Sequence, residues 1–293
     1  MTDLDRVRSH SLEWAHRFGL LSENWSEQDF LDFDLPLFAA LTHPHARGSV
    51  LDLLSDWYVW GWYLDDLIVD RFKRTGDIDG AREFLGAVAE GDTVVGRSLR
   101  DLLARTPRPE LARHLPNAIG DGLWEVENTA RSRVPDPVDY VQMRRLSGGV
   151  PWAMVLIEVG LGVEVTVPES LDWQRFADAF ADVVDLHNDL VSYRRETEYE
   201  HDVNNAVVVW QVHFGLSVTE AVLRVEQLLA ARTALFDELC ERLATPDTML
   251  LITAMREWLA GDLRWHAETA RYRKWPLRTF APRGLGTSAT RIG

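Results

Sequence analysis

Apolar residues recur at helical spacing along most of this 293-residue chain. Over residues 52–74 they stand at positions 53, 54, 57, 60, 64, 67, 68 and 72, which would bury one broad face of a helix. Gly76 follows as a stop signal. Neither regularly spaced alternating strands nor an internal repeat accompanies this pattern, so the chain is predicted to be all-α.

Further stretches show the same periodicity, separated by short turns that contain Gly, Pro or Asp. They span 81–104, 110–129, 137–161, 170–198, 203–214, 219–243 and 246–272. The β-branched run 203–212 has strand propensity, but a lone strand would have nothing to pair with. We expect one all-α domain over 1–275 and a mobile Gly/Pro-rich tail over 276–293.

Acidic residues outnumber basic ones, 46 to 31, which gives a formal net charge of −15. This balance disfavours nucleic-acid binding because an acidic protein is repelled by phosphates. The longest apolar run, 150–157, is shorter than the ~20 residues of a membrane span. The single cysteine excludes an intrachain disulfide, and the N-terminal MTDLDRVRSH lacks the apolar segment of a signal peptide. We therefore expect a cytoplasmic protein.

Three carboxylates interrupt the apolar segment 64–70, whose sequence is LDDLIVD. Asp66 and Asp70 are four residues apart and would share a helix face, and Asp65 is adjacent. Converging carboxylate oxygens suit a hard cation such as Mg²⁺. Taken alone, the motif is better explained by a solvated acidic helix end.

A second polar group lies in the segment 187–196, HNDLVSYRRE. Asn188, Ser192 and Glu196 are spaced i, i+4, i+8, so amide, hydroxyl and carboxylate oxygens would line one helical stripe as ligands of a single metal. The simpler alternative is a polar helix face bonded to water.

The segment 143–152, MRRLSGGVPW, predicts a break within a helix. Pro151 cannot donate to the carbonyl of Ser147, and Gly148 and Gly149 weaken the same turn. Unpaired carbonyls at a break could face a cation, although two helices meeting at a turn would look the same.

Twelve tryptophans accompany these motifs. Trp62 would lie on the side of its helix that carries Asp65 and Asp66, and Trp152 and Trp265 are near the other motifs. Core packing explains any one of them, whereas the group favours a pocket whose aromatic faces stabilise cations.

An acidic DD-rich helix, an Arg before a Gly-Gly break, an N-x₃-S-x₃-E stripe and a late Arg-Tyr, in this order, resemble the bacterial class I terpene synthases. The likeness is greatest to the germacradienol synthase domain of geosmin-type cyclases, through 56–74, 137–158 and 187–196, and it extends over 7–272. It implies a single-domain helical bundle around a central active-site cavity. It also implies Mg²⁺-dependent ionisation and cyclisation of a linear prenyl diphosphate to a sesquiterpene hydrocarbon or alcohol. Farnesyl diphosphate is the expected substrate, with geranyl and geranylgeranyl diphosphate as alternatives.

The resemblance assigns roles by position. It places Asp65 and Asp66 on two Mg²⁺ ions and Asn188, Ser192 and Glu196 on a third. Arg145 would sense the diphosphate, with Arg144 as the fallback if the register is shifted by one. Gly148 and Gly149 would be the linker and effector, the latter catalytic together with Asp65, Asp66 and Arg145. The remaining assignments are Arg195, Arg271 and Tyr272 as diphosphate ligands and Trp62, Gly148, Trp152 and Trp265 as pocket-lining residues.

One departure concerns the acidic motif. Its last Asp usually stands where this chain has Val69, so metal binding by Asp70, which comes one residue later, is in question. A homodimer is an expectation of the resemblance alone.

Three alternatives stay open at this stage. A chain-elongating prenyltransferase would carry a second DDxxD motif where this chain has NDLVS at 188–192. A hydrolase of the HD type would use His201 and Asp202, which form a lone pair here. A noncatalytic helical protein could sequester a prenyl diphosphate, but it would gain nothing from neutralising a leaving group.

Overall fold

The computed structural model describes residues 3–22 and 24–273, with backbone only at 115–119. Within this part of the chain the regular elements are helical and no strand occurs, which confirms the all-α prediction. The tail predicted for 276–293 lies outside the described residues.

The elements follow one another in an order that brings the predicted motifs to helix ends. They are α1 (Asp3–Phe18), α2 (Glu27–Phe33), α3 (Leu35–Thr42), α4 (Gly48–Ile68), the π-helical turn η1 (Val69–Lys73), α5 (Ile78–Glu90), α6 (Val94–Arg105), α7 (Leu111–Ala130), α8 (Pro137–Ser147), α9 (Val150–Leu161), α10 (Leu171–Arg195), the π-helical turn η2 (Glu196–Glu200), α11 (Ala206–Phe214), α12 (Val218–Leu243) and α13 (Met249–Glu268).

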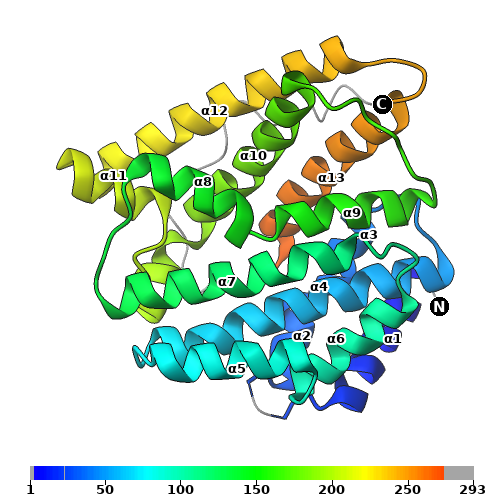
Figure 1. Ribbon diagram of the computed structural model, residues 1–293, viewed down its shortest axis with the longest axis horizontal. Helices are drawn as coiled ribbons and strands as arrows, with labels where there is room; N and C mark the ends of the chain where they lie inside the picture. The colour runs from blue at the N-terminus through cyan, green and yellow to red at the C-terminus, as the bar shows by residue number, and fades with distance from the viewer. Residues whose placement is uncertain (1–2, 23, 274–293) are drawn as a thin grey trace.

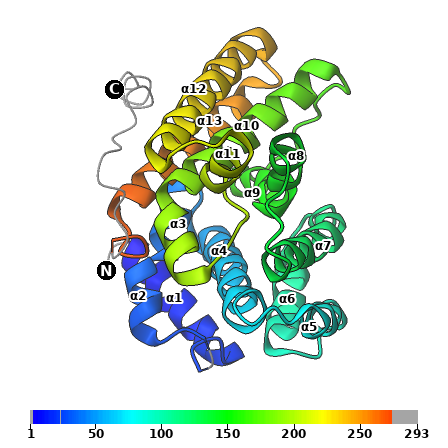
Figure 2. The same cartoon turned by 90° about the vertical axis from the view of Figure 1, so that its left-hand side faces the viewer.

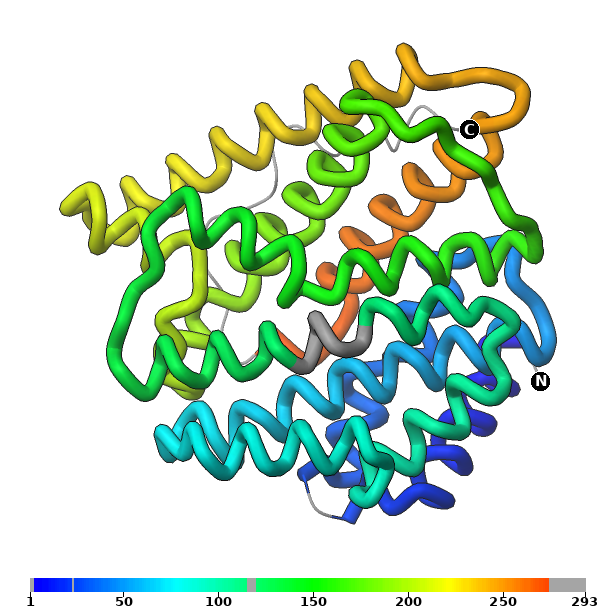
Figure 3. Tube along the Cα trace, viewed as in Figure 1, coloured from blue at the N-terminus to red at the C-terminus, as the bar shows by residue number. Residues whose placement is uncertain are grey.

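Helix α4 occupies the middle of the bundle (Figure 1). Seen end-on, it lies between α1–α3 on one side and α5–α7 on the other, with α10, α12 and α13 beyond (Figure 2). The chain trace shows α13 returning from the C-terminal half toward the N-terminal helices, where it packs against α3 (Figure 3). This return places the late Arg-Tyr motif next to the end of α4.

Capping residues divide the chain more finely than periodicity does. The single helix expected over 81–104 is two, because Gly91 adopts a left-handed conformation with φ 77° and Thr93 caps α6 by accepting from the Gly96 N–H. The run 203–214 is helical only from Ala206, where the Asn205 side chain caps the first turn.

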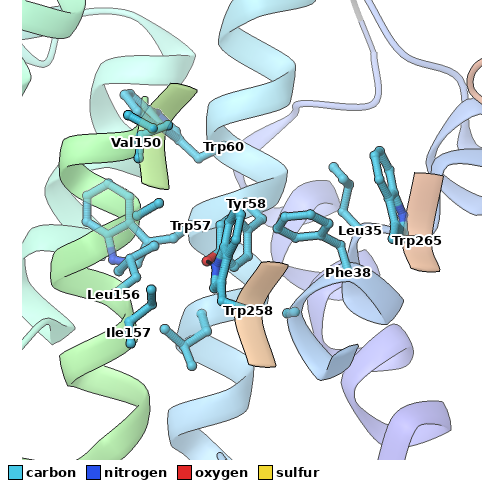
Figure 4. Close-up of a cluster of buried hydrophobic side chains, with 14 of the residues drawn as sticks. Leu35, Phe38, Trp57, Tyr58, Trp60, Val150, Leu156, Ile157, Trp258 and Trp265 are labelled. Atoms are coloured by element: carbon cyan, nitrogen blue, oxygen red, sulfur yellow. Dashed lines mark hydrogen bonds between the residues drawn. The ribbon is translucent and has the colours of Figure 1, made fainter. Parts of the chain in front are cut away.

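Buried aromatic side chains pack together in the core beside α4 (Figure 4). The ring of Phe38 on α3 lies edge-on to those of Tyr58, Trp258 and Trp265, with centroids 4.6, 5.6 and 5.2 Å away. Such pairs each contribute about 0.5–1.5 kcal/mol beyond the area they bury. They fix α3, α4 and α13 relative to one another and so fix the walls of the site described next.

Candidate active site

A cavity of about 200 Å³ lies among α4, α7, α9, α10 and α13. Two contacts join α4 to α13 and the residues just after it, at two different heights along the cavity. The Trp258 indole donates to the Tyr58 hydroxyl at 3.0 Å, and Arg271, just after α13, pairs with Asp66. Eight residues separate Tyr58 from Asp66, which is about 12 Å along a helix. The cavity therefore has an aromatic level and a charged level.

The two adjacent aspartates of α4 face different surroundings. Asp65 is open to the cavity with its side chain 55% exposed, and the surrounding protein together with the Asp66 charge raises its pKa. Asp66 is buried and accepts from Arg271 at 2.6 and 2.7 Å, from Arg195 at 2.7 Å and from Trp25 at 2.8 Å. Burial alone would raise its pKa, but the two guanidinium groups hold it below its ordinary value.

Asp70 is not part of the cavity wall. The chain leaves α4 through the π turn η1, and the Asp70 carboxylate lies 3.3 Å from both the Arg74 guanidinium and the Tyr199 hydroxyl. Asp70 is therefore not among the carboxylates that line the cavity with Asp65.

The three residues of the second motif lie along α10 and the start of η2. Asn188 and Glu196 line the cavity, whereas the buried Ser192 hydroxyl donates to the Asn188 carbonyl at 2.7 Å. Glu196 accepts from Asn205 at 2.8 Å, and burial together with nearby carboxylates raises its pKa to about 8. A carboxylate this poorly compensated favours a cation beside it.

Of the two neighbouring arginines on α8, Arg144 rather than Arg145 lines the cavity. Arg144 donates to Asn188 at 2.9 Å and to Asp189 at 3.0 Å. Arg145 points away and pairs with Asp182 at 2.6 Å. The position in the cavity wall that was expected for Arg145 is therefore held by the fallback, Arg144, because consecutive helical residues differ by about 100° in direction.

The predicted helix break is present between α8 and α9. Gly149 has φ 73°, a left-handed conformation that glycine adopts without a steric penalty. A Cβ on Gly148 would collide with the Asp185 carboxylate, and one on Gly149 would collide with the Trp152 indole. Both glycines line the cavity and are required by this close packing.

The C-terminal ligand candidates converge on the same end of the cavity. Arg195, Arg271 and Tyr272 all line it, and the Tyr272 hydroxyl lies 3.4 Å from the Asn188 amide nitrogen. The Arg271 guanidinium also sits 4.8 Å above the Phe33 ring, which helps to orient it.

Two of the three predicted wall tryptophans reach the cavity. Trp62 and Trp152 line it. Trp265 does not: its side chain is fully buried in the core and its indole donates to the Phe33 carbonyl at 2.9 Å. Tyr58, Trp60 and Trp258 line the cavity instead, and no sequence signal separates them from ordinary core aromatics.

Lys73 is a wall residue that sequence reasoning did not single out. It ends η1 and donates to Glu125 on α7 at 2.6 Å and to Asp202, just after η2, at 2.8 Å. The available signal was its rarity, since the chain has 31 basic residues and only two lysines, Lys73 and Lys274. Asp202 is thereby accounted for as an ion-pair partner, which removes the basis for an HD-type site.

The cavity wall also contains a carboxylate–imidazole pair that the sequence analysis did not identify. His266 lies 3.2 Å from Asp262 and, like it, lines the cavity. Their i, i+4 spacing on α13 was the only available signal.

Negative charge exceeds positive charge around the cavity, which fits a hard cation. The Asp185 Oδ2 makes no hydrogen bond within the described part of the chain. Carboxylate and amide oxygens dominate the polar wall, as Mg²⁺ requires. Seven carboxylates face four basic side chains, namely Asp65, Glu125, Asp185, Glu196, Glu200, Asp202 and Asp262 against Lys73, Arg144, Arg195 and Arg271.

No single described helix is long and apolar enough to cross a membrane. Among the described helices one pair, α11 and α12, meets the length and composition of a span when taken together, but the two are bent by 118°.

Relatives with known activities share nearly the whole chain. A 4-epi-cubebol synthase of Streptosporangium roseum is 27% identical over 92% of this chain and 87% of its own length. A pristinol synthase of Streptomyces pristinaespiralis is 26% identical over 92% of this chain and 80% of its own length.

Solved structures show the same fold. A point variant of cucumene synthase superposes with a TM-score of 0.79 at 22% identity, covering 93% of this chain and 97% of its own. Germacradien-4-ol synthase from Streptomyces citricolor gives 0.74 at 22% identity, covering 92% and 95%. Residues 56–235, which include most of the acidic helix α4, the helix break and the whole second motif, match the family model described as terpene synthase family 2, C-terminal metal binding. The chain belongs to this terpene synthase family.

Proposed function

We propose that this protein ionises and cyclises farnesyl diphosphate in the presence of Mg²⁺ and releases a sesquiterpene hydrocarbon or alcohol with diphosphate. The observation that carries the proposal is one cavity lined by aromatic rings and by a group of carboxylates and arginines, with Tyr58 about 12 Å along α4 from Asp66. The names of several relatives support farnesyl diphosphate, among them a 4-epi-cubebol synthase and a T-muurolol synthase that are both described as cyclising it.

The charged level would hold the leaving group. Asp65, Asn188 and Glu196 face the cavity with oxygen atoms that would hold Mg²⁺. Ser192 stays the proposed third ligand of its motif, because its hydroxyl gives its proton to the Asn188 backbone carbonyl and keeps its oxygen lone pairs for the ion. Bound Mg²⁺ supplies Lewis-acid neutralisation of the diphosphate charge. We propose three ions, as the resemblance implies.

The basic side chains act on the same anion. Arg144, Arg195, Arg271 and Tyr272 line the cavity and would donate to diphosphate oxygens as the carbon–oxygen bond lengthens. Donors fixed before the reaction stabilise the developing charge without a cost of reorganisation at that moment, which lowers the barrier to ionisation.

The aromatic level would fold the hydrocarbon chain and stabilise carbocations. Tyr58, Trp62, Trp152 and Trp258 present rings to the cavity. Each ring face can stabilise a desolvated cation by about 2 kcal/mol, and no side chain there is a strong nucleophile that would trap it. The walls also exclude bulk water, which would otherwise quench the cation early.

Incubation with C10, C15 and C20 prenyl diphosphates and Mg²⁺, followed by analysis of volatiles, tests the proposal. A cyclic C15 product formed faster than C10 or C20 products supports it. Binding without any terpene product would overturn it and favour the noncatalytic alternative.

Glu196→Gln tests the metal assignment. It keeps the shape but removes the charge, so turnover should fall about 100-fold or more while the fold is retained. Glu198→Gln is the matched control, because Glu198 is exposed and pairs with Arg194 at 2.8 Å outside the cavity wall. Wild-type turnover in the Glu196 variant would refute the assignment.

A homodimer and a cytoplasmic location complete the proposal. Light scattering of the purified protein would test the dimer, and fractionation of the producing cells would test the location.

A further inference from the structure

The Trp152 indole on α9 packs against α4 and against the break between α8 and α9. It projects from the first turn of α9 into the cavity wall. Its ring lies near those of Trp57 and Tyr58 on α4, with centroids 6.2 and 5.8 Å away. The indole is thus the largest wall element that α9 contributes to the aromatic level.

Gly61 makes room for this indole on the α4 side. A Cβ at Gly61 would lie 3.1 Å from both Cζ2 and Cη2 of Trp152, closer than ordinary carbon contacts. Glycine inside a helix costs about 0.5–1 kcal/mol relative to alanine, so its presence in the middle of α4 needs a packing reason. Gly86, in the exposed face of α5, offers a contrast because a Cβ there would meet nothing within 4 Å.

Gly149 makes room for neighbouring atoms along the same edge of the indole. In its left-handed conformation, a Cβ there would collide with Nε1 of the same indole. The Nε1-to-Cη2 edge of the Trp152 ring therefore packs against a glycine in mid-α4 and a glycine at the break. A side chain at Gly61 or at Gly149 would displace the Trp152 ring.

We propose that Gly61 and Trp152 form a specificity-determining pair, in which the glycine allows the indole to shape the aromatic level and so selects among the folds of the prenyl chain. This inference rests on the proposed function. Both residues line the cavity, Gly61 about one helical turn or 6 Å before Asp65, and neither is among the proposed metal or diphosphate ligands. Changes in the pair should therefore alter product distribution and leave the Mg²⁺ requirement intact.

Gly61→Ala is the primary test. The added methyl group must push the indole by a few tenths of an ångström, so the major product should lose at least half of its share. Turnover of farnesyl diphosphate should fall about 10-fold, in the range that one misplaced methylene produces in an apolar pocket. The Mg²⁺ concentration for half-maximal rate should stay within about twofold of wild type, because neither Gly61 nor Trp152 supplies an oxygen ligand to the metal.

Trp152→Phe and the double variant provide the decisive comparison. Phenylalanine lacks the outer ring that Gly61 contacts, so adding Gly61→Ala to Trp152→Phe should change the product profile little. The two effects are then strongly non-additive. If Gly61→Ala fails to fold, the same double variant should fold again, because the colliding atoms are gone.

Gly86→Ala is the matched control for a glycine-to-alanine change in a helix. It should keep the wild-type product profile and be slightly more stable. An unchanged profile in Gly61→Ala, or additive effects in the double variant, would overturn the pair. Absence of any cyclic product from the wild-type enzyme would instead overturn the proposed function.

Discussion

Neighbouring residues at this site do different work. Asp65 faces the cavity, whereas Asp66 accepts hydrogen bonds from Arg195 and Arg271 behind it. The same division separates Arg144 from Arg145. Pairs of identical residues on a helix cannot share a role, because successive side chains diverge by about 100°.

Arg144→Gln and Arg145→Gln should therefore behave differently. Loss of a donor to the leaving group costs about 10²–10³-fold, so kcat/KM of the Arg144 variant should fall by that amount. The Arg145 variant should stay within about threefold of wild type, because its side chain pairs outside the cavity. Steady-state kinetics with farnesyl diphosphate measures both.

Stability controls complete that comparison. Asp182, the main partner of Arg145, keeps its ion pair with Arg232 at 2.5 Å, so the Arg145 variant should stay folded. Asp189 keeps the Ala206 N–H at 2.9 Å after loss of Arg144. Equal loss of activity in both variants would contradict the assignment of Arg144.

His43 should make stability fall in mild acid. It is buried against the Tyr58 hydroxyl at 2.7 Å, and burial lowers its pKa from 6.5 to about 3. Below pH 6.5 the unfolded chain binds a proton at His43 that the folded protein does not, so stability decreases as pH falls. Between about pH 7.5 and 5 this contribution amounts to about 2 kcal/mol.

Urea unfolding of wild type and His43→Gln at these two pH values checks the effect. The variant should lose about 2 kcal/mol less than wild type over the interval. Identical pH slopes would show that His43 does not carry it.

The residue scale also marks where sequence reasoning stopped. The pattern of the second motif predicts that Asn188 and Glu196 share a stripe, and both line the cavity. The sequence could not distinguish Trp152, which lines the cavity, from Trp265, which does not. An aromatic residue on an apolar helix face shows the same pattern in a core and in a pocket. That distinction depends on what packs against the face.

At the scale of elements, α9 is bounded by left-handed glycines at both ends. Gly149 precedes it with φ 73° and Gly162 follows it with φ 67°. Only Gly149 lies against a side chain that a Cβ would strike; nothing described lies within 4 Å of a Cβ at Gly162. Substitutions at Gly162 and Gly149 therefore allow the cost of a left-handed backbone to be measured apart from the effect of displacing a side chain in the cavity wall.

Gly162→Ala should lower the free energy of unfolding by about 1–2 kcal/mol, the cost of a left-handed alanine, with wild-type turnover. Gly149→Ala should lose more stability and also at least about 10-fold in turnover, because it displaces the Trp152 indole. Chemical denaturation and product assays measure the two quantities. Full activity in the Gly149 variant would contradict the role of the break.

The elements show what periodicity can predict. The break at 148–149 is predictable because Pro and Gly remove or weaken backbone hydrogen bonds locally. The π turns that end α4 and α10 were not predicted, since the sequences VDRFK and ETEYE continue a helical pattern. Tertiary ion pairs, such as those of Lys73, lie across the fold and leave no local signal.

At the scale of the whole molecule, Mg²⁺ and pyrophosphate should stabilise the protein only together. The carboxylate excess needs a cation, and the anion needs both that cation and the arginines. A ligand that binds only the folded state at about 100 times its Kd adds about 2.7 kcal/mol. Thermal unfolding with each component, both, and both plus EDTA checks this expectation.

The EDTA sample should return to the melting temperature of the free protein. Stabilisation by pyrophosphate alone, unchanged by EDTA, would contradict joint binding.

The likeness of the whole chain is to the family as a whole. Relatives with different products are about equally similar to the chain, so overall identity does not single out the germacradienol synthase domain.

The pairing of Arg195 and Arg271 with Asp66 gives any incoming anion a built-in competitor. The anion must bind these guanidinium groups more strongly than a buried carboxylate already does. Chloride or a simple carboxylic acid carries one charge and cannot displace that partner, whereas a diphosphate brings several. The Asp66 carboxylate thereby disfavours singly charged anions at these two guanidinium groups, so discrimination by charge begins before any metal or hydrocarbon chain is engaged.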